Sequence, residues 1–382
     1  MAVLRHRVHI DDYPIQARQL PETGVKKSMY TKPELLTICR RSRKIAALAC
    51  IVMLLCGSAW AEIAVFMEEP YGRFGHINPT GHAAIYLNQV CAASPTELRV
   101  CKPGETGVVI SRYYRVAGYD WFAMPLIPYL YAVDRATQIP ATATPVSVEA
   151  LRDAYRRRYL RSLAPDGPSG SIPQGDWTQL VGASYDRKIY GLSLRTTPEQ
   201  DRKFIEMFND RSNDSHFNLV YRNCANFSET VINFYFSGAV HRSFIFDAGV
   251  MTPQQVARSV VKYGKKHPEL DLTPFVIPQV PGTIQRSRAV HGVAESLVKS
   301  KKYVVPLAIL LPETTGVLAV SWFTLDRFRF PKDAEVLSGA ALVKAETTEP
   351  NGLTAPLPDK TKRTESAAES GSQKQAAPAL ER

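Results

Sequence analysis

The sequence predicts an α+β fold, in which an antiparallel sheet packs against helices and further helices follow toward the C-terminus. Hydrophobic residues make up 45% of the 382 residues, which is ordinary for a chain with a sizeable core. Residues 82–90, 106–114 and 188–194 are rich in β-branched and aromatic residues, as strands are. The Thr-Pro pairs at 197–198 and 252–253 each supply an N-cap followed by proline, and so predict helix starts.

Three further segments are assigned by the same rules. The apolar run 119–133 contains Pro125 and Pro128, so we expect it to be extended rather than helical. Ser147 is predicted to cap a basic helix over residues 148–160. Residues 216–223, "HFNLVYRN", are predicted to form a strand.

The first 61 residues have the pattern of an export signal. The basic block Arg40–Lys44 precedes the apolar run 45–56, and "GSAWAE" favours cleavage after Ala61. The alternative is an uncleaved membrane anchor. Without residues 1–61 the chain keeps 37 Lys and Arg against 32 Asp and Glu, so its net charge falls from +11 to +5. Nucleic-acid binding therefore loses most of its support.

The cysteine count singles out one thiol. Three of the six cysteines lie within residues 1–61, which leaves Cys91, Cys101 and Cys224. Cys91 and Cys101 flank a turn-like segment, so we expect a local disulfide between them in an oxidising compartment. Cys224 is then the unpaired thiol, and a cysteine that merely packs is the alternative reading.

The C-terminal part of the chain contains an apolar segment followed by a polar tail. Residues 303–323 are apolar over a length that could span a bilayer, but they contain two prolines and Glu313. They are either a membrane-associated segment or a buried part of the domain. The predicted division of the chain is a presequence at 1–61, a catalytic domain at 62–250, a basic helical extension at 251–302, the apolar segment at 303–330 and a disordered tail at 331–382.

Cys224 stands where a helix is predicted to begin. Phe227, Val231, Phe234 and Tyr235 recur at helical spacing and predict one buried face. Asn223 is a good N-cap residue, which would place Cys224 at the first helical position. The free N–H groups there favour a thiolate and can stabilise an oxyanion, to which Asn223 could contribute.

A nucleophilic thiol needs a base, and His82 is the best candidate. It follows a glycine at the start of a predicted strand, in "GHAAIYLN". A structural histidine is the alternative reading. A metal site built from His76, His82 and Cys91 is disfavoured, because the spacing matches no known ligand pattern, and no cofactor is implied.

"GHAAIYLN", followed about 140 residues later by "NCANF", resembles the circularly permuted branch of the papain-like (NlpC-type) cysteine amidases and acyltransferases. The pattern is most similar to the periplasmic domains of bacterial lipoprotein transacylases and covers residues 70–240. The resemblance implies a permuted papain-like fold, with Cys224 as the nucleophile and His82 as the base. A third polar residue would orient the imidazole; His76, Ser111 and Arg112 are the candidates.

The resemblance implies an exported cell-envelope cysteine amidase or acyltransferase, located in the periplasm or on the outer face of the membrane. Its substrate would be an amide or ester of a peptidoglycan peptide or a lipoprotein. The alternative is a non-catalytic envelope binding protein. Its basic helices, at 152–161 and 262–266, would then face anionic lipid or cell-wall polymer.

Overall fold

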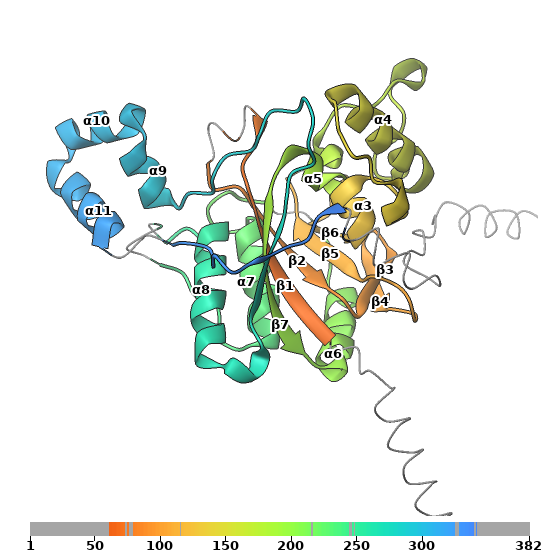
Figure 1. Cartoon of the computed structure of the whole chain (residues 1–382), viewed down its shortest axis with the longest axis horizontal. Helices are drawn as coiled ribbons and strands as arrows, with labels where there is room; N and C mark the ends of the chain where they lie inside the picture. Colours follow the sequence, from red (N-terminus) through yellow and green to blue (C-terminus); the bar gives the residue numbers. More distant parts are fainter. Residues whose placement is uncertain are drawn as a thin grey trace, which may run out of the picture. The chain divides into compact units, whose positions relative to one another are not determined.

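The computed structural model describes residues 61–341, except for 73–74, 76–78, 115, 215–216, 244–246, 248, 325–327 and 340. The signal pattern and the residues after 341 therefore lie outside the described residues. The fold combines a mostly antiparallel sheet with several helices (Figure 1). The α+β class predicted from the sequence is confirmed.

A seven-stranded sheet with the order β6-β5-β2-β1-β7-β8-β9 forms the centre of the domain. Every pairing is antiparallel except that of β8 with β9. The strands of this sheet are β1 (Ala61–Glu68), β2 (His82–Leu87), β5 (Val108–Arg112), β6 (Trp121–Pro125), β7 (Ile189–Thr196), β8 (Thr273–Ile277) and β9 (Glu335–Val336). A separate hairpin pairs β3 (Val90–Ser94) with β4 (Glu97–Val100).

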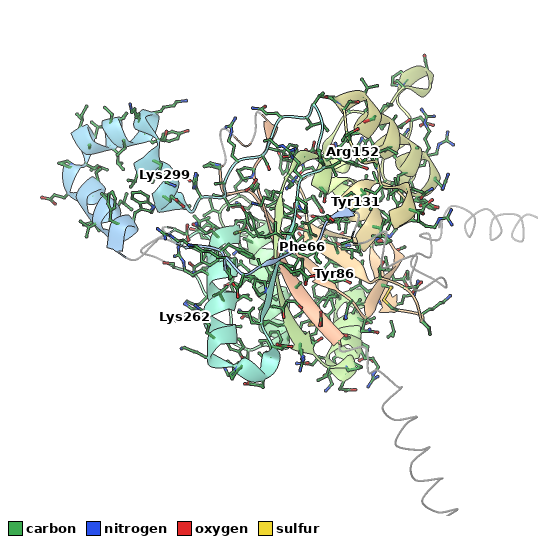
Figure 2. The ribbon with its side chains drawn as sticks, in the orientation of Figure 1. Phe66, Tyr86, Tyr131, Arg152, Lys262 and Lys299 are labelled. Carbon is green, nitrogen blue, oxygen red and sulfur yellow. A yellow bond between two sulfur atoms is a disulfide. The ribbon has the colours of Figure 1, made fainter. Side chains whose placement is uncertain are left out.

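The middle of the sheet is buried on both faces. Seven of the eight residues of β1 are buried, which agrees with its nearly continuous apolar sequence. The rings of Phe66 and Tyr86, which Figure 2 labels, stack with their centres 5.9 Å apart on one face. The register pairs Glu68 with His82, so these two side chains emerge on the same face at the end of the sheet.

Two long helices pack side by side against the sheet (Figure 1). Helix α7 (Cys224–Tyr235) packs against β2 and β5, and α8 (Pro253–Lys266) packs against β1 and β7. The other helices in the described residues are α3 (Leu126–Tyr131), α4 (Pro145–Tyr155), α5 (Ala183–Asp186), α6 (Pro198–Asn209), α9 (Val293–Lys299), α10 (Lys301–Leu310) and α11 (Pro312–Thr324). Short helical turns are η1 (Ala136–Gln138), η2 (Arg156–Leu160), η3 (Pro168–Gly170), η4 (Asp176–Leu180) and η5 (Pro268–Leu270).

The predicted helix starts after Thr197 and Thr252 are confirmed. Thr197 Oγ1 accepts a hydrogen bond from the amide of Gln200, and Thr252 Oγ1 accepts one from the amide of Gln255. The cap of α4 is Thr144 rather than Ser147, which occupies the third helical position and completes a capping box.

Two predicted segments differ in the structure. Residues 126–131 form α3 despite their prolines, because Pro125 is the N-cap and Pro128 lies in the first turn, where N–H groups have no helical partner. Residues 217–222 are a turn rather than a strand. There, Asn218 Oδ1 accepts hydrogen bonds from the amides of Val220 and Tyr221, which closes a local turn in place of strand pairing.

The predicted boundaries at 250 and 331 do not separate folded parts. Residues 251–302 contribute α8 and β8, and β8 pairs with β7 in the central sheet. In the predicted tail, β9 pairs with β8, and Leu337 packs against the core. Within the described residues, the backbone of β8 and β9 thus extends one edge of the sheet.

None of the helices in the described residues is long and apolar enough to cross a bilayer. The apolar segment 303–323 instead lies in two shorter helices, α10 and α11, which are separated at Leu311, and Pro312 begins the second.

Candidate functional site

Cys224 is the first residue of α7, as the sequence predicts. The side-chain oxygen of Asn223 caps the helix by accepting a hydrogen bond from the amide of Asn226 at 2.9 Å. Its Nδ2 donates to the carbonyls of Leu219 and Met251, at 2.9 and 3.0 Å. Because both ends of this amide are occupied, Asn223 positions the helix start and is not free to support an oxyanion.

The Cys224 thiol lies beside the peptide that joins His82 to Ala83. The amides of Ala83 and Ala225 both interact with the sulfur, so two backbone N–H groups converge on it. One comes from the start of β2 and the other from the first turn of α7. Such an arrangement can stabilise negative charge on sulfur or on an oxygen bound near it.

A close backbone approach explains the glycine before His82. Gly81 has a φ of +75°, and a Cβ there would lie 2.1 Å from the carbonyl oxygen of Glu68. No other residue fits this turn without moving β1. The "GH" pair therefore sets where β2 begins and holds His82 at the end of the sheet.

Ser111 on β5 holds the His82 ring. Its hydroxyl lies 2.9 Å from Nε2 of His82 and donates a hydrogen bond to the carbonyl of Ala83 at 2.7 Å. A hydroxyl has one hydrogen, so Nε2 must be the donor to Ser111. The neutral ring therefore carries its proton on Nε2 and its basic lone pair on Nδ1.

Of the three candidates for the third residue, Ser111 makes the contact with His82. The Arg112 side chain forms an ion pair with Asp120 at 2.5 Å and lies over the Phe227 ring of α7. Neighbouring residues of a strand face opposite sides, which is why Ser111 and Arg112 diverge. His76 lies outside the described residues.

Burial sets the protonation state of both predicted catalytic side chains. It raises the pKa of the Cys224 thiol to about 11, which the amides of Ala83 and Ala225 only partly oppose and the charge of Glu68 reinforces. Burial and the positive charge of Arg187 hold the pKa of His82 well below 6.5. Both residues retain some exposed surface, but protein surrounds the titrating atoms densely.

The resting site therefore contains a neutral thiol and a neutral imidazole. This differs from the expectation that the start of the helix would activate Cys224 as a thiolate, because desolvation outweighs the amide contacts. Within the described residues, no hydrogen bond joins the thiol to the His82 ring.

A buried polar network that was not predicted from the sequence adjoins His82. The ring stacks on Tyr113 at 5.0 Å, and Tyr129 donates a hydrogen bond to Glu68 Oε1. Arg187 Nη1 lies 2.9 Å from Glu68 Oε2, which is an ion-pair contact outside hydrogen-bonding geometry. Burial raises the pKa of Glu68, although Arg187 and Tyr129 oppose the shift. The sequence feature that could have indicated this network is an acidic residue, Glu68, at the end of an otherwise apolar strand.

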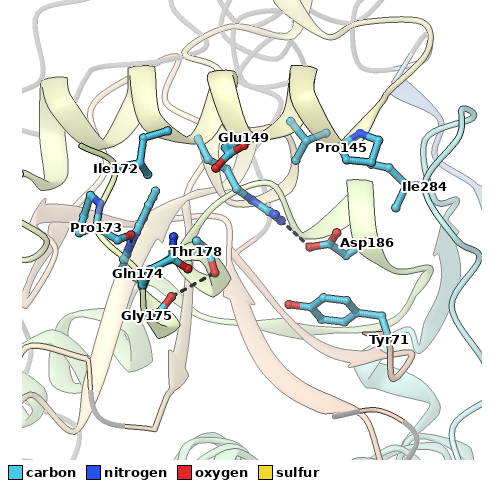
Figure 3. Close-up of a pocket in the computed structure, with 13 residues that line it drawn as sticks. Tyr71, Pro145, Glu149, Ile172, Pro173, Gln174, Gly175, Thr178, Asp186 and Ile284 are labelled. Atoms are coloured by element: carbon cyan, nitrogen blue, oxygen red, sulfur yellow. Dashed lines mark hydrogen bonds and ion pairs between the residues drawn. The ribbon is translucent and has the colours of Figure 1, made fainter. Parts of the chain in front are cut away.

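A cavity of about 390 Å³ lies between α4 and the segment 172–178 (Figure 3). Tyr71 and Asp186 line it, and neither Cys224 nor His82 does. The Arg187 guanidinium lies 4.5 Å from the centre of the Tyr71 ring, so the cavity adjoins the network through this pair. The cavity is a neighbouring feature, and the thiol itself is not within it.

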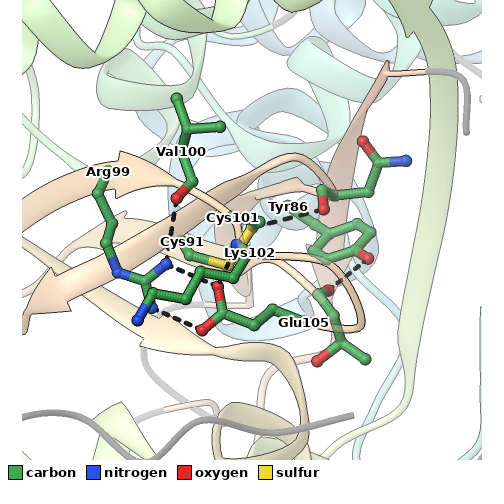
Figure 4. Close-up of a disulfide and its surroundings, with 9 residues drawn as sticks. Tyr86, Cys91, Arg99, Val100, Cys101, Lys102 and Glu105 are labelled. Atoms are coloured by element: carbon green, nitrogen blue, oxygen red, sulfur yellow. Dashed lines mark hydrogen bonds and ion pairs between the residues drawn. A yellow bond between two sulfur atoms is a disulfide. The ribbon is translucent and has the colours of Figure 1, made fainter. Parts of the chain in front are cut away.

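The predicted disulfide between Cys91 and Cys101 is present and ties the β3–β4 hairpin together (Figure 4). Glu105 lies close to both sulfurs, but it pairs with Arg99 at 2.6 Å. Sulfurs joined in a disulfide are not thiolate ligands, so this trio does not have the chemistry of a metal site.

The basic residues of the predicted binding helix are engaged within the chain. Each of its five arginines forms an ion pair with an aspartate, namely Arg152 with Asp186, Arg156 and Arg157 with Asp153, Arg158 with Asp134, and Arg161 with Asp166. Arg156 is fully buried and also pairs with Asp166. This helix therefore presents little uncompensated positive charge to an anionic polymer.

Comparison of the chain with protein-family models, curated proteins and solved structures gives no match. The resemblance to the permuted papain-like branch therefore remains a prediction from the two short motifs.

Proposed function

We propose that this protein is an exported thiol-dependent amidase or acyltransferase that uses Cys224 and His82, on a permuted papain-like fold. The observation that carries the proposal is the convergence of two amides, Ala83 and Ala225, on the sulfur of a free cysteine at a helix start. A structural thiol does not need such donors, whereas an acyl-transfer site does. The Cys91–Cys101 disulfide supports an oxidising compartment, as the export pattern also does.

The chemistry proceeds from the neutral pair. Nδ1 of His82 accepts the thiol proton while sulfur bonds to the carbonyl carbon of an amide or ester, and the amides of Ala83 and Ala225 stabilise the oxyanion. The carbon–nitrogen or carbon–oxygen bond then breaks, and the imidazolium gives its proton to the leaving amine or alcohol. Water or an acceptor amine finally releases the acyl group from sulfur. Peptidoglycan peptides and lipoproteins are the substrate classes that we propose for this compartment.

The test is direct detection of the acyl-enzyme. Purified protein is mixed with an O-acylated lipopeptide or with a muropeptide, and the tryptic peptide of residues 223–242, which contains Cys224, is analysed by mass spectrometry. An acyl adduct that hydroxylamine removes is expected with one of the two substrates. The adduct should be absent in Cys224→Ser and strongly reduced in His82→Ala.

His267→Ala is the matched control, because His267 is a partly exposed histidine outside the site that pairs with Glu269. It should form the adduct as the wild-type protein does. An adduct that His82→Ala forms at the wild-type rate would remove His82 from the mechanism. Failure of both substrates and of a simple p-nitrophenyl ester to acylate Cys224 would leave the thiol as a packing residue and refute the enzyme proposal.

A further inference from the structure

Helices α10 and α11 are apolar on all sides and yet exposed. None of the residues of α10 is buried. Of the sixteen large hydrophobic residues that are exposed in the described part of the chain, eight lie between 303 and 323: Tyr303, Val305, Ile309, Leu310, Leu311, Val317, Val320 and Phe323. A helix that is hydrophobic all round belongs in a protein core or in lipid. Something must therefore cover these two helices.

The two helices form a hairpin with an apolar tip and a basic base. They contact each other, and α11 returns to α9, where Lys299 Nζ lies 5.6 Å from the centre of the Trp322 ring. At the tip, Ile309 and Leu310 are 74% and 76% exposed. At the base, Lys301 and Lys302 are exposed at the start of α10, just after Lys299, which Figure 2 labels.

Each arm is too short to span a bilayer. The ten residues of α10 and the thirteen of α11 measure about 15 and 20 Å, against a hydrocarbon core of about 30 Å. Such a hairpin can enter one leaflet from the side on which its basic base remains. Lysines and a tryptophan at the base match the headgroup region, where both residue types accumulate.

We propose that the α10–α11 hairpin is a membrane-docking element that inserts its tip into a bilayer surface containing anionic lipid. The exposed lysines at its base specify the anionic headgroups, and the apolar tip supplies the hydrophobic contact. This inference does not depend on the chemistry of Cys224. Glu313 limits the depth of insertion, because it lies in the first turn of α11, next to the tip, and a carboxylate is costly to bury in hydrocarbon.

The test places a fluorescent reporter at the tip of the full chain. Leu310→Trp is compared with Val146→Trp, since Val146 on α4 is equally exposed, at 77%, and lies outside the hairpin. With vesicles of phosphatidylcholine and phosphatidylglycerol, brominated lipid should quench the tryptophan at 310 but not the one at 146. The four native tryptophans, Trp322 among them, are present in both variants, so the quenching of the wild-type protein is subtracted from that of each variant to isolate positions 310 and 146.

Two sets of variants separate the electrostatic contribution to membrane binding from the hydrophobic contribution of the tip. Neutralising both lysines with Lys301→Gln and Lys302→Gln should weaken binding to anionic vesicles about fivefold for each charge, with little effect on neutral vesicles. Glu313→Gln should strengthen binding. Ile309→Asp with Leu310→Asp should abolish hairpin insertion, whereas Val146→Asp should not.

Equal quenching at positions 310 and 146 would overturn the proposal. Blue-shifted emission from the tryptophan at 310 before vesicles are added would also overturn it, because the hairpin would then be covered by protein. Sedimentation would show whether that cover is a second copy, which Ile309→Asp with Leu310→Asp would convert to monomer.

Discussion

The protonation state of Cys224 is the prediction that follows most directly from the structure. Burial raises the thiol pKa from an ordinary 9.0 to about 11. At pH 8 the thiolate fraction should therefore be about 0.1%, compared with about 9% for the ordinary thiol, so alkylation should be about a hundredfold slower. The perturbation is pH itself, raised in steps from about 7 to about 10.

Iodoacetamide labelling of the tryptic peptide 223–242 measures this rate at Cys224 alone. The rate should rise about tenfold for each pH unit and should not level off below pH 10. His82→Ala should leave this profile unchanged, because the imidazole is already neutral and contributes no charge to the thiol. Its loss should appear only in acylation by substrate, where His82 acts as the base.

A plateau with its midpoint below about pH 8, shifted upward in His82→Ala, would refute this reasoning. That result would mean that Cys224 and His82 form a thiolate–imidazolium pair in the resting protein. The dense surroundings of the sulfur would then be less important than the amides of Ala83 and Ala225.

Three further changes test the parts around the site. Ser111→Ala should lower the Nε2–H population of His82, measured by the nitrogen-15 shifts of the ring; a dominant Nδ1–H tautomer in the wild-type protein would contradict the assignment. Asn223→Ala should lower the free energy of unfolding in urea by about 2 kcal/mol, because it removes the cap and the donor to the carbonyls of Leu219 and Met251, the second of which is buried; a change below about 0.5 kcal/mol would be inconsistent with this role. Burial raises the pKa of Asp201 from 3.8 to about 6, although Tyr235 donates a hydrogen bond to it. The folded state therefore loses stability as pH rises from about 4 to about 6, so Asp201→Asn should stabilise the protein at pH 7 by up to about 3 kcal/mol and have little effect at pH 4; denaturant unfolding at the two pH values checks this, and equal effects at both would refute it.

Local chemistry could be predicted from neighbouring residues. The Thr-Pro helix starts, the Asn223 cap and the disulfide each depend on a few adjacent or nearby residues, and each is confirmed. Prediction failed where a local rule has an exception: Pro128 lies in the first turn of α3, and Asn218 closes a turn in a segment with strand-like composition.

The sequence by itself determined which side chains are available: one free thiol, a histidine after a glycine, and an apolar segment near the C-terminus. Only the tertiary structure decided their states. Ser111 lies 29 residues from His82, and Glu68 lies 119 residues from Arg187; strand register and chain crossing bring these pairs together. The pKa of Cys224 is likewise a property of the packed site. Desolvation of the sulfur depends on all the groups that surround it in the fold, and these cannot be identified from its sequence neighbours.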